Sequence, residues 1–432
     1  MKKRILFSVT TLLIIAIIIF NACRDDNNSD NTPTNYITLG VIMPLDQEKG
    51  ELIKNALITA IDEINANSGV GNEYQIKLNI KSSEGPDRKI AAVNAAKDIV
   101  ANSQFVTGII TSFSSSSTGV IEEIIIPKSY PTIAGSATAE NLSGISDYFQ
   151  RLCAPDPFEA NVMADQANDY GIASVAIAVE DGDTYSSGMA TAFQTAFGGG
   201  AATLVNFTAN DPEYANKLTQ LLAGNPEAIF ISMINPNIFI EFFTELENMK
   251  DGKDLTNTSF ILCDGLCSSD LFQAPVDYIL GDVNGHPKNF GAFPSADTTS
   301  VAYTYFANEL YQKYNQKVAS YNAQFYDIGY LFAMAIEKAF KSASTSDMKT
   351  FRDKVNYYIR QVSHGAPGDP VVSPDQGWIS IKTACNLGGV NYNGASGNCD
   401  IDSEGNAITP YSVFKVTKPG GHFAFEIIKI IP

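Results

Sequence analysis

Basic residues are scarce in this chain. It has 29 lysines and arginines against 47 aspartates and glutamates, which gives a formal net charge of -18, and no basic cluster offsets the excess. Nucleic acids and anionic membrane surfaces attract proteins through clustered positive charge. The composition therefore excludes binding to either partner through charge, and we expect the acidity to serve solubility.

Histidine is rarer still, and the common catalytic motifs are missing. His286, His364 and His422 do not stand at ligand spacing, so we expect no zinc site. The chain also lacks a nucleophile elbow, a metalloprotease helix motif and a phosphate-binding loop. The segment DIDSEGNAITPY begins like a calcium loop at Asp400, but it has Tyr411 where a bidentate glutamate belongs, and we expect a β-turn there. We predict a protein that is not an enzyme and that needs no metal or cofactor.

The N-terminus has the order of an export signal. MKKR is basic, ILFSVTTLLIIAIIIF is apolar, and NAC ends on Cys23 after Ala22. This order predicts a secretory signal over residues 1–22, and its last residues resemble the lipobox at which bacterial lipoproteins are cut and acylated. The alternative is an uncleaved membrane anchor, for which the apolar block falls short of about 20 residues. Residues 23–35 are polar and predict a tether, so we expect a protein lipid-anchored to a bacterial membrane, in the periplasm or at the cell surface.

From Tyr36 onward, short apolar runs alternate with amphipathic segments, which predicts βαβ units around parallel sheets. The first series has expected strands at 36–45, 74–83, 105–112 and 131–138 and expected helices at 50–69 and 87–102. The second series has expected strands at 173–181, 202–209, 228–234 and 259–265 and expected helices at 158–170, 187–197, 214–223 and 237–249. A long apolar helix over 321–342 is most simply returned to the first series.

This pattern predicts an α/β protein with two lobes, each a doubly wound parallel sheet, joined by a multi-strand hinge. The chain is too long for one small domain, and at 45% hydrophobic residues it can build substantial cores. We assign residues 36–152 and 322–360 to lobe 1. We assign residues 153–321 and part of 361–432 to lobe 2, with a C-terminal hinge and extension.

The chain resembles the type I periplasmic solute-binding proteins, in the leucine/isoleucine/valine-binding branch that feeds ATP-driven importers. The resemblance rests on the order of six segments: GELIKNALITAIDEINANSGV, SSSSTGV, PTIAGSATAENLS, YFQRLCAPDPFEANVMADQA, SYNAQFYDIGYLFAMAIEKA and GGVNYNGASGNCDIDSEGNA. It implies two lobes that close around a small ligand and an ABC permease that receives the ligand. The alternative is a sensory receptor that uses the same lobes to control a signalling partner.

Four consecutive serines, Ser114 to Ser117, lie between an expected strand and an expected helix. A serine tract is typical of a flexible linker, yet a tight β-α turn has no use for one. Such a turn exposes unpaired backbone N–H groups at the start of the helix, where a carboxylate binds well. The resemblance implies that Ser115 holds the ligand carboxylate. The alternative is that Ser116 or Ser117 simply caps the helix.

The resemblance implies further ligand contacts in both lobes. Ser136, Ala137 and Thr138 match a second contact strip, Tyr185 matches a tyrosine that covers the ligand, and Asp264 matches the acid that accepts the ligand ammonium. Asp264 also follows an expected strand at its C-terminal end, where open α/β sheets bind ligands. The alternatives are that the strip from Ser136 to Thr138 is a strand end that caps the next segment, that Tyr185 packs on the surface, and that Asp264 only forms a turn. Donors for a carboxylate on one lobe and an acid on the other describe an α-amino acid.

Two stretches depart from the family pattern and leave the ligand side chain open. The expected mouth of the site has Asp46, Gln47, Glu48 and Lys49 where relatives often have Ser-Gly with an aromatic residue nearby. Asn235 stands where relatives often have an aromatic residue. These polar residues keep a polar amino acid, or another small carboxylate, possible as the ligand.

The cysteines suit an exported protein. Besides Cys23 there are five, so at least one is free or paired between chains. Cys385 and Cys399 enclose a Gly- and Asn-rich loop, and we expect a disulfide between them. Cys263 and Cys267 flank Asp264 and are candidates for a second bridge that clips the binding loop. The state of Cys153 stays open.

Overall fold

The first sheet is built by the N-terminal series of strands. The computed structural model describes residues 35–198, 201–249 and 255–431. Its first sheet has the order β2-β1-β3-β4-β5, and β1, β3, β4 and β5 pair in parallel. The strands are β1 (Tyr36–Met43), β2 (Gln75–Ser82), β3 (Val106–Thr111), β4 (Thr132–Ala134) and β5 (Phe149–Arg151). The carboxyl ends of the paired strands therefore meet at one edge of the sheet.

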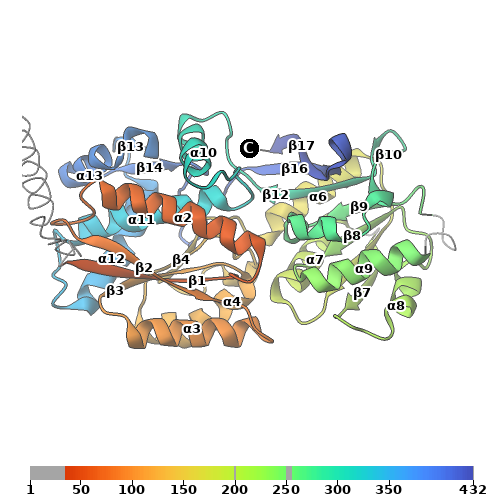
Figure 1. Ribbon diagram of the computed structural model, residues 1–432, viewed down its shortest axis with the longest axis horizontal. Coiled ribbons are helices and arrows are strands. Elements are labelled where there is room, and N and C mark those ends of the chain that lie inside the picture. The colour runs from red at the N-terminus through yellow and green to blue at the C-terminus, as the bar shows by residue number, and fades with distance from the viewer. Residues whose placement is uncertain (1–34, 199–200, 250–254, 432) are drawn as a thin grey trace, which may run out of the picture. The chain divides into compact units, whose positions relative to one another are not determined.

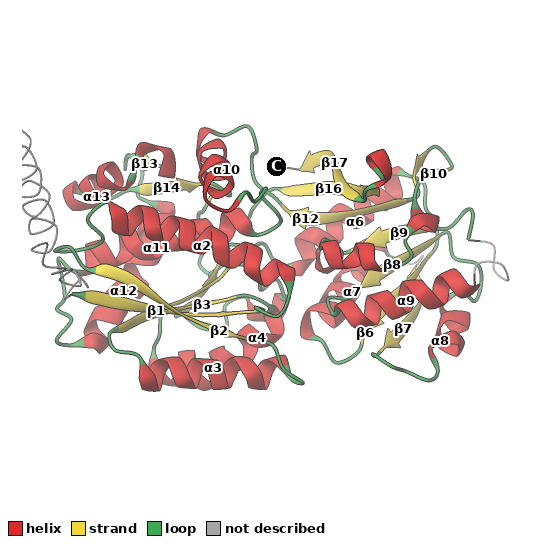
Figure 2. Cartoon of the chain, in the orientation of Figure 1, coloured by secondary structure: helices red, strands yellow, loops and turns green. Residues whose placement is uncertain are grey.

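Both faces of the first sheet are buried under helices. Leu39 and Val41 of β1 belong to the core beneath α2 (Glu48–Ala66), α11 (Asn322–Ala339) and α12 (Met348–His364). Ile42 belongs to the opposite core, beneath α3 (Arg88–Asn102) and α4 (Ser114–Val120), which continues into the π-helical η1 (Ile121–Ile125). Successive strand residues point to opposite faces, so β1 supplies both cores. Figure 2 shows the two helix layers on either side of the strands.

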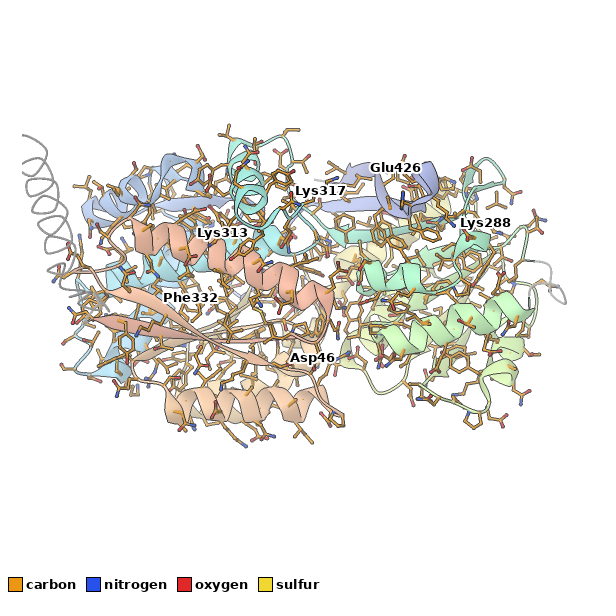
Figure 3. The ribbon with its side chains drawn as sticks, in the orientation of Figure 1. Asp46, Lys288, Lys313, Lys317, Phe332 and Glu426 are labelled. Atoms are coloured by element: carbon orange, nitrogen blue, oxygen red, sulfur yellow. The ribbon has the colours of Figure 1, made fainter. Side chains whose placement is uncertain are left out.

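Close packing of α11 on the first sheet depends on a glycine. Phe332 of α11, labelled in Figure 3, lies directly over Gly108 of β3. A Cβ atom on residue 108 would lie 2.3 Å from Phe332 Cε1, well inside van der Waals contact. Glycine therefore lets the aromatic ring pack onto the strand backbone at this position.

The second sheet has the order β17-β16-β12-β9-β8-β6-β7. Its strands are β6 (Val175–Glu180), β7 (Ala201–Phe207), β8 (Ala228–Ser232), β9 (Ser259–Leu262), β12 (Asn289–Pro294), β16 (Tyr411–Thr417) and β17 (Ala424–Ile431). Strands β12, β9, β8, β6 and β7 pair in parallel, and the β16–β17 hairpin adds an antiparallel edge next to β12. Helices α6 (Asp156–Asp169), α7 (Thr184–Phe197), α8 (Tyr214–Leu221) and α9 (Pro236–Met249) pack with this sheet, as Figure 1 shows.

Within the described residues, the chain passes between the two cores three times, at residues 152–155, 295–300 and 408–410. Helix α10 (Val301–Tyr314) packs with the first core through Phe306 and Leu310. This corrects the expected boundary, which placed residues 301–314 with lobe 2. Helix α13 (Trp378–Leu387) also packs with the first core, whereas β16 returns the chain to the second sheet. An amphipathic helix pattern shows that α10 has one buried face, but it does not show which sheet that face covers.

Short elements complete the described chain. They are α5 (Ile126–Lys128), η2 (Glu140–Leu142), η3 (Asp264–Leu266), η4 (Ser269–Gln273), η5 (Asp277–Ile279), β10 (Asp282–Val283), β11 (His286–Pro287), β13 (Val371–Val372), η6 (Pro374–Gln376), β14 (Asn391–Gly394), β15 (Gly397–Asn398) and η7 (Pro419–Gly421). The segment DIDSEGNA forms a turn, closed by the backbone N–H of Asp402 donating to Asn406 O at 2.9 Å. Asp402 Oδ1 accepts from the N–H groups of Glu404 and Asn406, so this carboxylate shapes the turn.

The N-terminal predictions fall on residues that the structure does not describe. The expected signal peptide at residues 1–22, the acylation site Cys23 and the tether up to residue 34 all lie outside the described residues. Within 35–198, 201–249 and 255–431, no helix combines the length and the apolar character that crossing a membrane requires.

Candidate ligand-binding site

Asp264 lies at the carboxyl end of β9, as the first residue of η3. Its side chain is only 9% exposed, and both of its carboxylate oxygens accept hydrogen bonds from tyrosine hydroxyls. Tyr185, in the first turn of α7, donates to Oδ1, and Tyr321, just before α11, donates to Oδ2. The two donors come from segments that pack in different cores. The carboxylate is therefore held between the two halves of the described chain, and it does not serve merely to form a turn.

Two further acids lie buried behind Asp264. The backbone N–H of Asp264 donates to Glu159 Oε1 at 2.9 Å, and Glu159 and Asp156 both belong to α6 and are fully buried. Burial raises the pKa of Asp156 to about 8, with the Thr138 hydroxyl opposing the shift. Burial also raises the pKa of Glu159 and of Asp264 above their usual ranges. Removing carboxylates from water disfavours their charged forms, and with a pKa of about 8 Asp156 holds its proton at neutral pH.

The serine tract forms the first turn of α4. Ser116 Oγ donates to Phe113 O at 2.9 Å, and Ser117 Oγ donates to Thr111 Oγ1 at 2.9 Å. The N-cap residue Phe113 makes no side-chain capping bond, so the alternative of a serine cap is wrong. Ser116 thus donates to the N-cap residue and Ser117 to the last residue of β3, instead of accepting from helix N–H groups. Ser115 lies in this turn, but its side chain is outside the described set.

The second strip follows β4 and is held by Arg151. This guanidinium is fully buried, and its hydrogen-bond acceptors among the described residues are neutral: Nη1 donates to Ala137 O and Ala139 O, both at 2.8 Å. Its Nε donates to Asn406 Oδ1 at 2.7 Å. The N–H of Ala139 in turn donates to Ser114 Oγ at 2.9 Å, which ties the second strip to the serine turn. Buried carbonyls satisfied in this way fix the strip in one conformation.

One cavity of about 40 Å³ is lined by residues of the serine turn, by residues of the second strip and by Asp264. It is lined by Lys49, Ile53, Phe113, Ser114, Ser136, Thr138, Tyr185, Ile234, Asp264, Gly265, Cys267, Ser320 and Tyr321. The structure thus brings together Ser136, Thr138, Tyr185 and Asp264 from the predicted set. Ala137 is buried but is not among the lining residues, and its carbonyl is engaged by Arg151. The Oγ of Ser136 has no hydrogen-bond partner in the described structure and is free to bind a ligand.

A wider cleft of about 900 Å³ lies beside this cavity and is lined by charged and polar residues. Asp46, Gln47, Glu48 and Asn235, the residues that depart from the family pattern, are all part of its lining. Asn235 is anchored there, because its N–H donates to Glu180 Oε2 at 2.8 Å. The polar mouth expected from the sequence is therefore present as a polar cleft.

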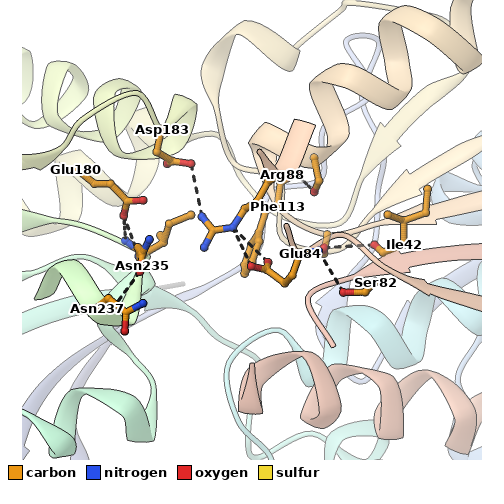
Figure 4. Close-up of polar contacts among 12 residues, drawn as sticks. Ile42, Ser82, Glu84, Arg88, Phe113, Glu180, Asp183, Asn235 and Asn237 are labelled. Carbon is orange, nitrogen blue, oxygen red and sulfur yellow. Dashed lines mark hydrogen bonds and ion pairs between the residues drawn. The ribbon is translucent and has the colours of Figure 1, made fainter. Parts of the chain in front are cut away.

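Figure 4 shows how an ion-pair network spans this cleft. Arg88, at the start of α3, lies 3.2 Å from Glu84 Oε1 on its own side. Its Nη1 lies 4.0 Å from Oδ2 of Asp183, the N-cap residue of α7 across the cleft. The guanidinium therefore has acidic partners on both sides.

The sequence pattern missed three residues of this site. Tyr321 adopts a left-handed conformation with φ of 63°, and Arg151 of β5 donates to a carbonyl of the second strip. Neither carries a sequence signal, because their partners are distant in the chain or belong to the backbone. Lys49 was noted only as part of a polar mouth, and the structure places it in the small cavity together with Asp264.

The disulfide predictions are wrong. Cys153, Cys263, Cys267, Cys385 and Cys399 are all free thiols. The Cys263 Sγ lies 3.6 Å from Met233 O in the second core, and the Cys399 Sγ lies 3.7 Å from Ser396 Oγ. Both thiol groups are buried against neighbours other than their expected partners.

The loop expected to need a disulfide is held by Asp327 of α11. This buried carboxylate accepts from the Tyr392 hydroxyl at 2.8 Å and from the N–H groups of Ala395 and Ser396 at 2.8 and 2.7 Å. A carboxylate that accepts several hydrogen bonds restrains the loop without a covalent bridge.

Comparison with known proteins identifies the family. The family model described as "Receptor family ligand binding region" matches residues 52–418, and the chain belongs to this family. The Leu/Ile/Val-binding protein homolog 3 of Brucella melitensis is 28% identical over 206 residues, which cover 45% of this chain and 53% of that protein. The chain spans about half the length of the curated relatives it matches.

Solved structures share the fold over most of the chain. The leucine binding protein LivK from Thermotoga maritima superposes with a TM-score of 0.71 at 22% identity, covering 91% of this chain and 98% of that chain. The branched-chain amino acid transporter substrate binding protein LivJ from Streptococcus pneumoniae, in complex with isoleucine, gives a TM-score of 0.69 at 17% identity, covering 91% and 100%. The expected α/β fold of the type I periplasmic binding proteins is confirmed.

Proposed function

We propose that this chain is an extracytoplasmic substrate-binding protein that captures a small amino acid or related carboxylate and delivers it to an ABC importer. The observation that carries the proposal is the single cavity that joins Asp264 to the hydroxyls of Ser136 and Thr138. An acid held by two tyrosines suits a ligand ammonium, and the hydroxyls suit a ligand carboxylate. An α-amino acid presents both groups.

Capture requires the two halves of the site to separate. A cavity of about 40 Å³ holds about three water molecules, which is too little for an amino acid. The contacts that close it, Tyr321 with Asp264 and Arg88 with Asp183, are polar and can exchange with water. Hinged closure of two domains around a ligand is the established mode of periplasmic binding proteins.

The proposal includes a cellular location and binding partners. Export and acylation at Cys23 would anchor the chain to a bacterial membrane, facing the periplasm or the cell surface. An ABC permease would receive the ligand, and contact with the membrane would run through the lipid alone. We assign the protein no enzymatic activity and no nucleic-acid partner. The curated relative and the two solved structures, whose names state leucine, isoleucine or valine binding, support the amino-acid class.

A second candidate function is a sensory receptor that uses the same site to control a signalling partner. The family's description as a receptor ligand-binding region supports it. Crosslinking in native membranes separates the two functions: a permease as the crosslinked partner supports import, and a sensor kinase supports signalling.

The ligand class is tested by thermal unfolding against a panel of amino acids and small carboxylates. A ligand present at 100 times its dissociation constant raises the free energy of unfolding by about 2.7 kcal/mol. We expect at least one α-amino acid to stabilise the protein, and its D-enantiomer to do so less. Stabilisation by none of the panel contradicts the proposal.

A further inference from the structure

Lys49 is a basic residue of the candidate site that forms no close ion pair with the described residues. It lies in the first turn of α2 and lines the small cavity, where Asp264 is the only acidic lining residue. Its Nζ lies 4.6 Å from the centroid of the Phe113 ring. Across the described parts of the chain, no carboxylate oxygen lies within 4.0 Å of this ammonium. Burial lowers the pKa of Lys49 and the neighbouring Arg88 lowers it further, while the charges of Asp264, Glu84 and Glu180 oppose the shift.

The neighbouring charged groups are already engaged. Glu48 accepts a hydrogen bond from Ser269 Oγ, and Glu51 pairs with Lys54. Arg88 has Glu84 at 3.2 Å and a second acid across the cleft. A desolvated ammonium is costly unless a carboxylate pairs with it. Among the described residues, Lys49 therefore has acids in its surroundings but no close ion pair, and a ligand carboxylate can supply one.

A second cavity adjoins the first, and its lining includes polar donors as well as one acid, Glu48, which accepts a hydrogen bond from Ser269 Oγ. It measures about 380 Å³ and shares Lys49, Cys267, Ser320 and Tyr321 with the small cavity. Gln324 and Ser295 also line it, and they are only 1% and 9% exposed. The Nε2 of Gln324 and the Oγ of Ser295 have no hydrogen-bond partner in the described structure. An ammonium, an amide N–H and a hydroxyl around one cavity form a set of donors for a carboxylate.

We propose that Lys49 is a specificity-determining residue that selects a ligand with a second carboxylate, an acidic amino acid, whose side chain extends past Lys49 toward Gln324 and Ser295. The inference rests on the proposed function and names the ligand class of the same site. A ligand with an aliphatic side chain would bury the Lys49 ammonium without pairing it. An acidic side chain neutralises this cation, while Asp264 still receives the ligand ammonium.

Titration calorimetry on the mature chain tests the proposal with ligands matched in shape. L-glutamate is compared with L-glutamine, and L-aspartate with L-asparagine, because each pair differs in one charge. We expect at least one acid to bind about thirtyfold or more tightly than its amide, since leaving a buried charge unpaired is costly. Equal affinity for acid and amide in both pairs, or tighter binding of leucine, overturns the proposal while the proposed function stands.

Variants assign the preference to Lys49. In Lys49→Met we expect affinity for the acid to fall about thirtyfold or more, and affinity for the amide to change by less than about threefold. Lys49→Gln, which keeps a polar side chain, should lose the same preference, and Lys54→Met on the same helix should keep it. Thermal unfolding of each variant shows that it is folded. If Lys49→Met weakens acid and amide equally, Lys49 binds the α-carboxylate and the specificity assignment fails.

A ligand without an ammonium separates this proposal from the proposed function. If glutarate binds the parent as tightly as glutamate and loses affinity in Lys49→Met, the Lys49 assignment stands and the amino-acid part of the proposed function fails. If none of the five ligands binds while another amino acid of the thermal-unfolding panel does, the Lys49 proposal fails and the proposed function stands. If no member of the panel binds, both proposals fail.

Discussion

The hydroxyl of Tyr321 donates a hydrogen bond to Asp264 Oδ2. This bond connects a segment that packs with the first core to the carboxyl end of β9 in the second sheet. Tyr185 holds the other oxygen of the same carboxylate from within its own half. In the proposed capture, Tyr185 keeps Asp264 oriented while the two halves are apart, and the Tyr321 bond forms again when they close around the ligand. Preorganised acceptors of this kind lower the cost of ordering on binding.

The first prediction concerns Asp264 and Thr138. Asp264→Asn keeps the shape but removes the charge that faces the ligand ammonium, so we expect a loss of about 2–5 kcal/mol of binding free energy. Thr138→Val removes one hydroxyl from a site that keeps other donors, and we expect a smaller loss of about 1–3 kcal/mol. Calorimetry with the ligand found by screening ranks the two variants. Unchanged affinity in Asp264→Asn, with a loss in Thr138→Val, would show that the ligand lacks an ammonium.

The second prediction concerns Arg151. Arg151→Met would remove the donor to Ala137 O and to Asn406 Oδ1, whereas Ala139 O would keep the N–H of Leu142 as a donor. Each buried acceptor left without a donor costs about 1–3 kcal/mol. We expect a fall of about 3 kcal/mol or more in the free energy of unfolding by urea. Arg360→Met, which removes one exposed hydrogen bond to Ser403 O, is the matched control and should change stability by less than about 0.5 kcal/mol. Equal effects of the two substitutions would contradict the role of Arg151.

The fold was predictable because hydrophobic periodicity is a local signal. Leu39, Val41 and Ile42 alternate between two cores, as a strand buried on both faces must. Asp264 was also predictable, since it directly follows a strand whose carboxyl end faces the site. The assignment of residues 301–314 failed because a helix with one apolar face fits either sheet.

The rest of the site depends on contacts between distant parts of the chain. Tyr321 reaches Asp264 over 57 positions from a left-handed backbone conformation that a tyrosine rarely adopts. The spacing of the cysteines along the sequence shows how long a loop a disulfide would close. Whether the disulfide forms depends on the distance between the two residues and on the directions of their Cβ atoms in the fold. Cys399 instead packs beside Ser396. Such geometry exists only once the chain has folded.

The third prediction concerns the loop that Asp327 holds. Asp327→Asn removes the charge and places a side-chain amide N–H group opposite the backbone N–H groups of Ala395 and Ser396, which then lose an acceptor. We expect a loss of about 2–3 kcal/mol in the free energy of unfolding. A reducing agent should leave the stability of the parent unchanged, because its described cysteines are free. Urea unfolding with and without reductant checks both statements. A loss of about 3 kcal/mol on reduction would instead establish a disulfide.

The fourth prediction concerns the membrane anchor. Cys23→Ser removes the thiol that acylation requires, so we expect the protein to leave the membrane fraction and to appear in the soluble extracytoplasmic fraction. Cys153→Ser is the matched control, because this buried thiol lies far along the chain from the expected cleavage site, and it should leave the distribution unchanged. Cell fractionation followed by immunoblotting measures both. Retention of the Cys23→Ser variant in the membrane would identify the apolar N-terminal block as a transmembrane anchor.

The fifth prediction concerns pH and Glu63. Burial raises the pKa of Glu63 to about 7 from its usual value near 4.5, while the hydroxyls of Tyr326 and Tyr330, each donating at 2.7 Å, oppose the shift. Between pH 4.5 and 7 the native state holds this proton more tightly than the unfolded state does. The contribution of Glu63 to stability is therefore complete below the unfolded pKa and is lost as the pH rises through about 7, a change of about 2–3 kcal/mol. Glu63→Gln, which stays neutral, should gain stability relative to the parent by this amount between pH 5 and pH 8 in urea unfolding. Glu51→Gln, which changes an exposed residue of the same helix, is the control. If the free energy of unfolding of the parent and of Glu63→Gln varied in parallel with pH, Glu63 would be charged in the native state and the prediction would be wrong.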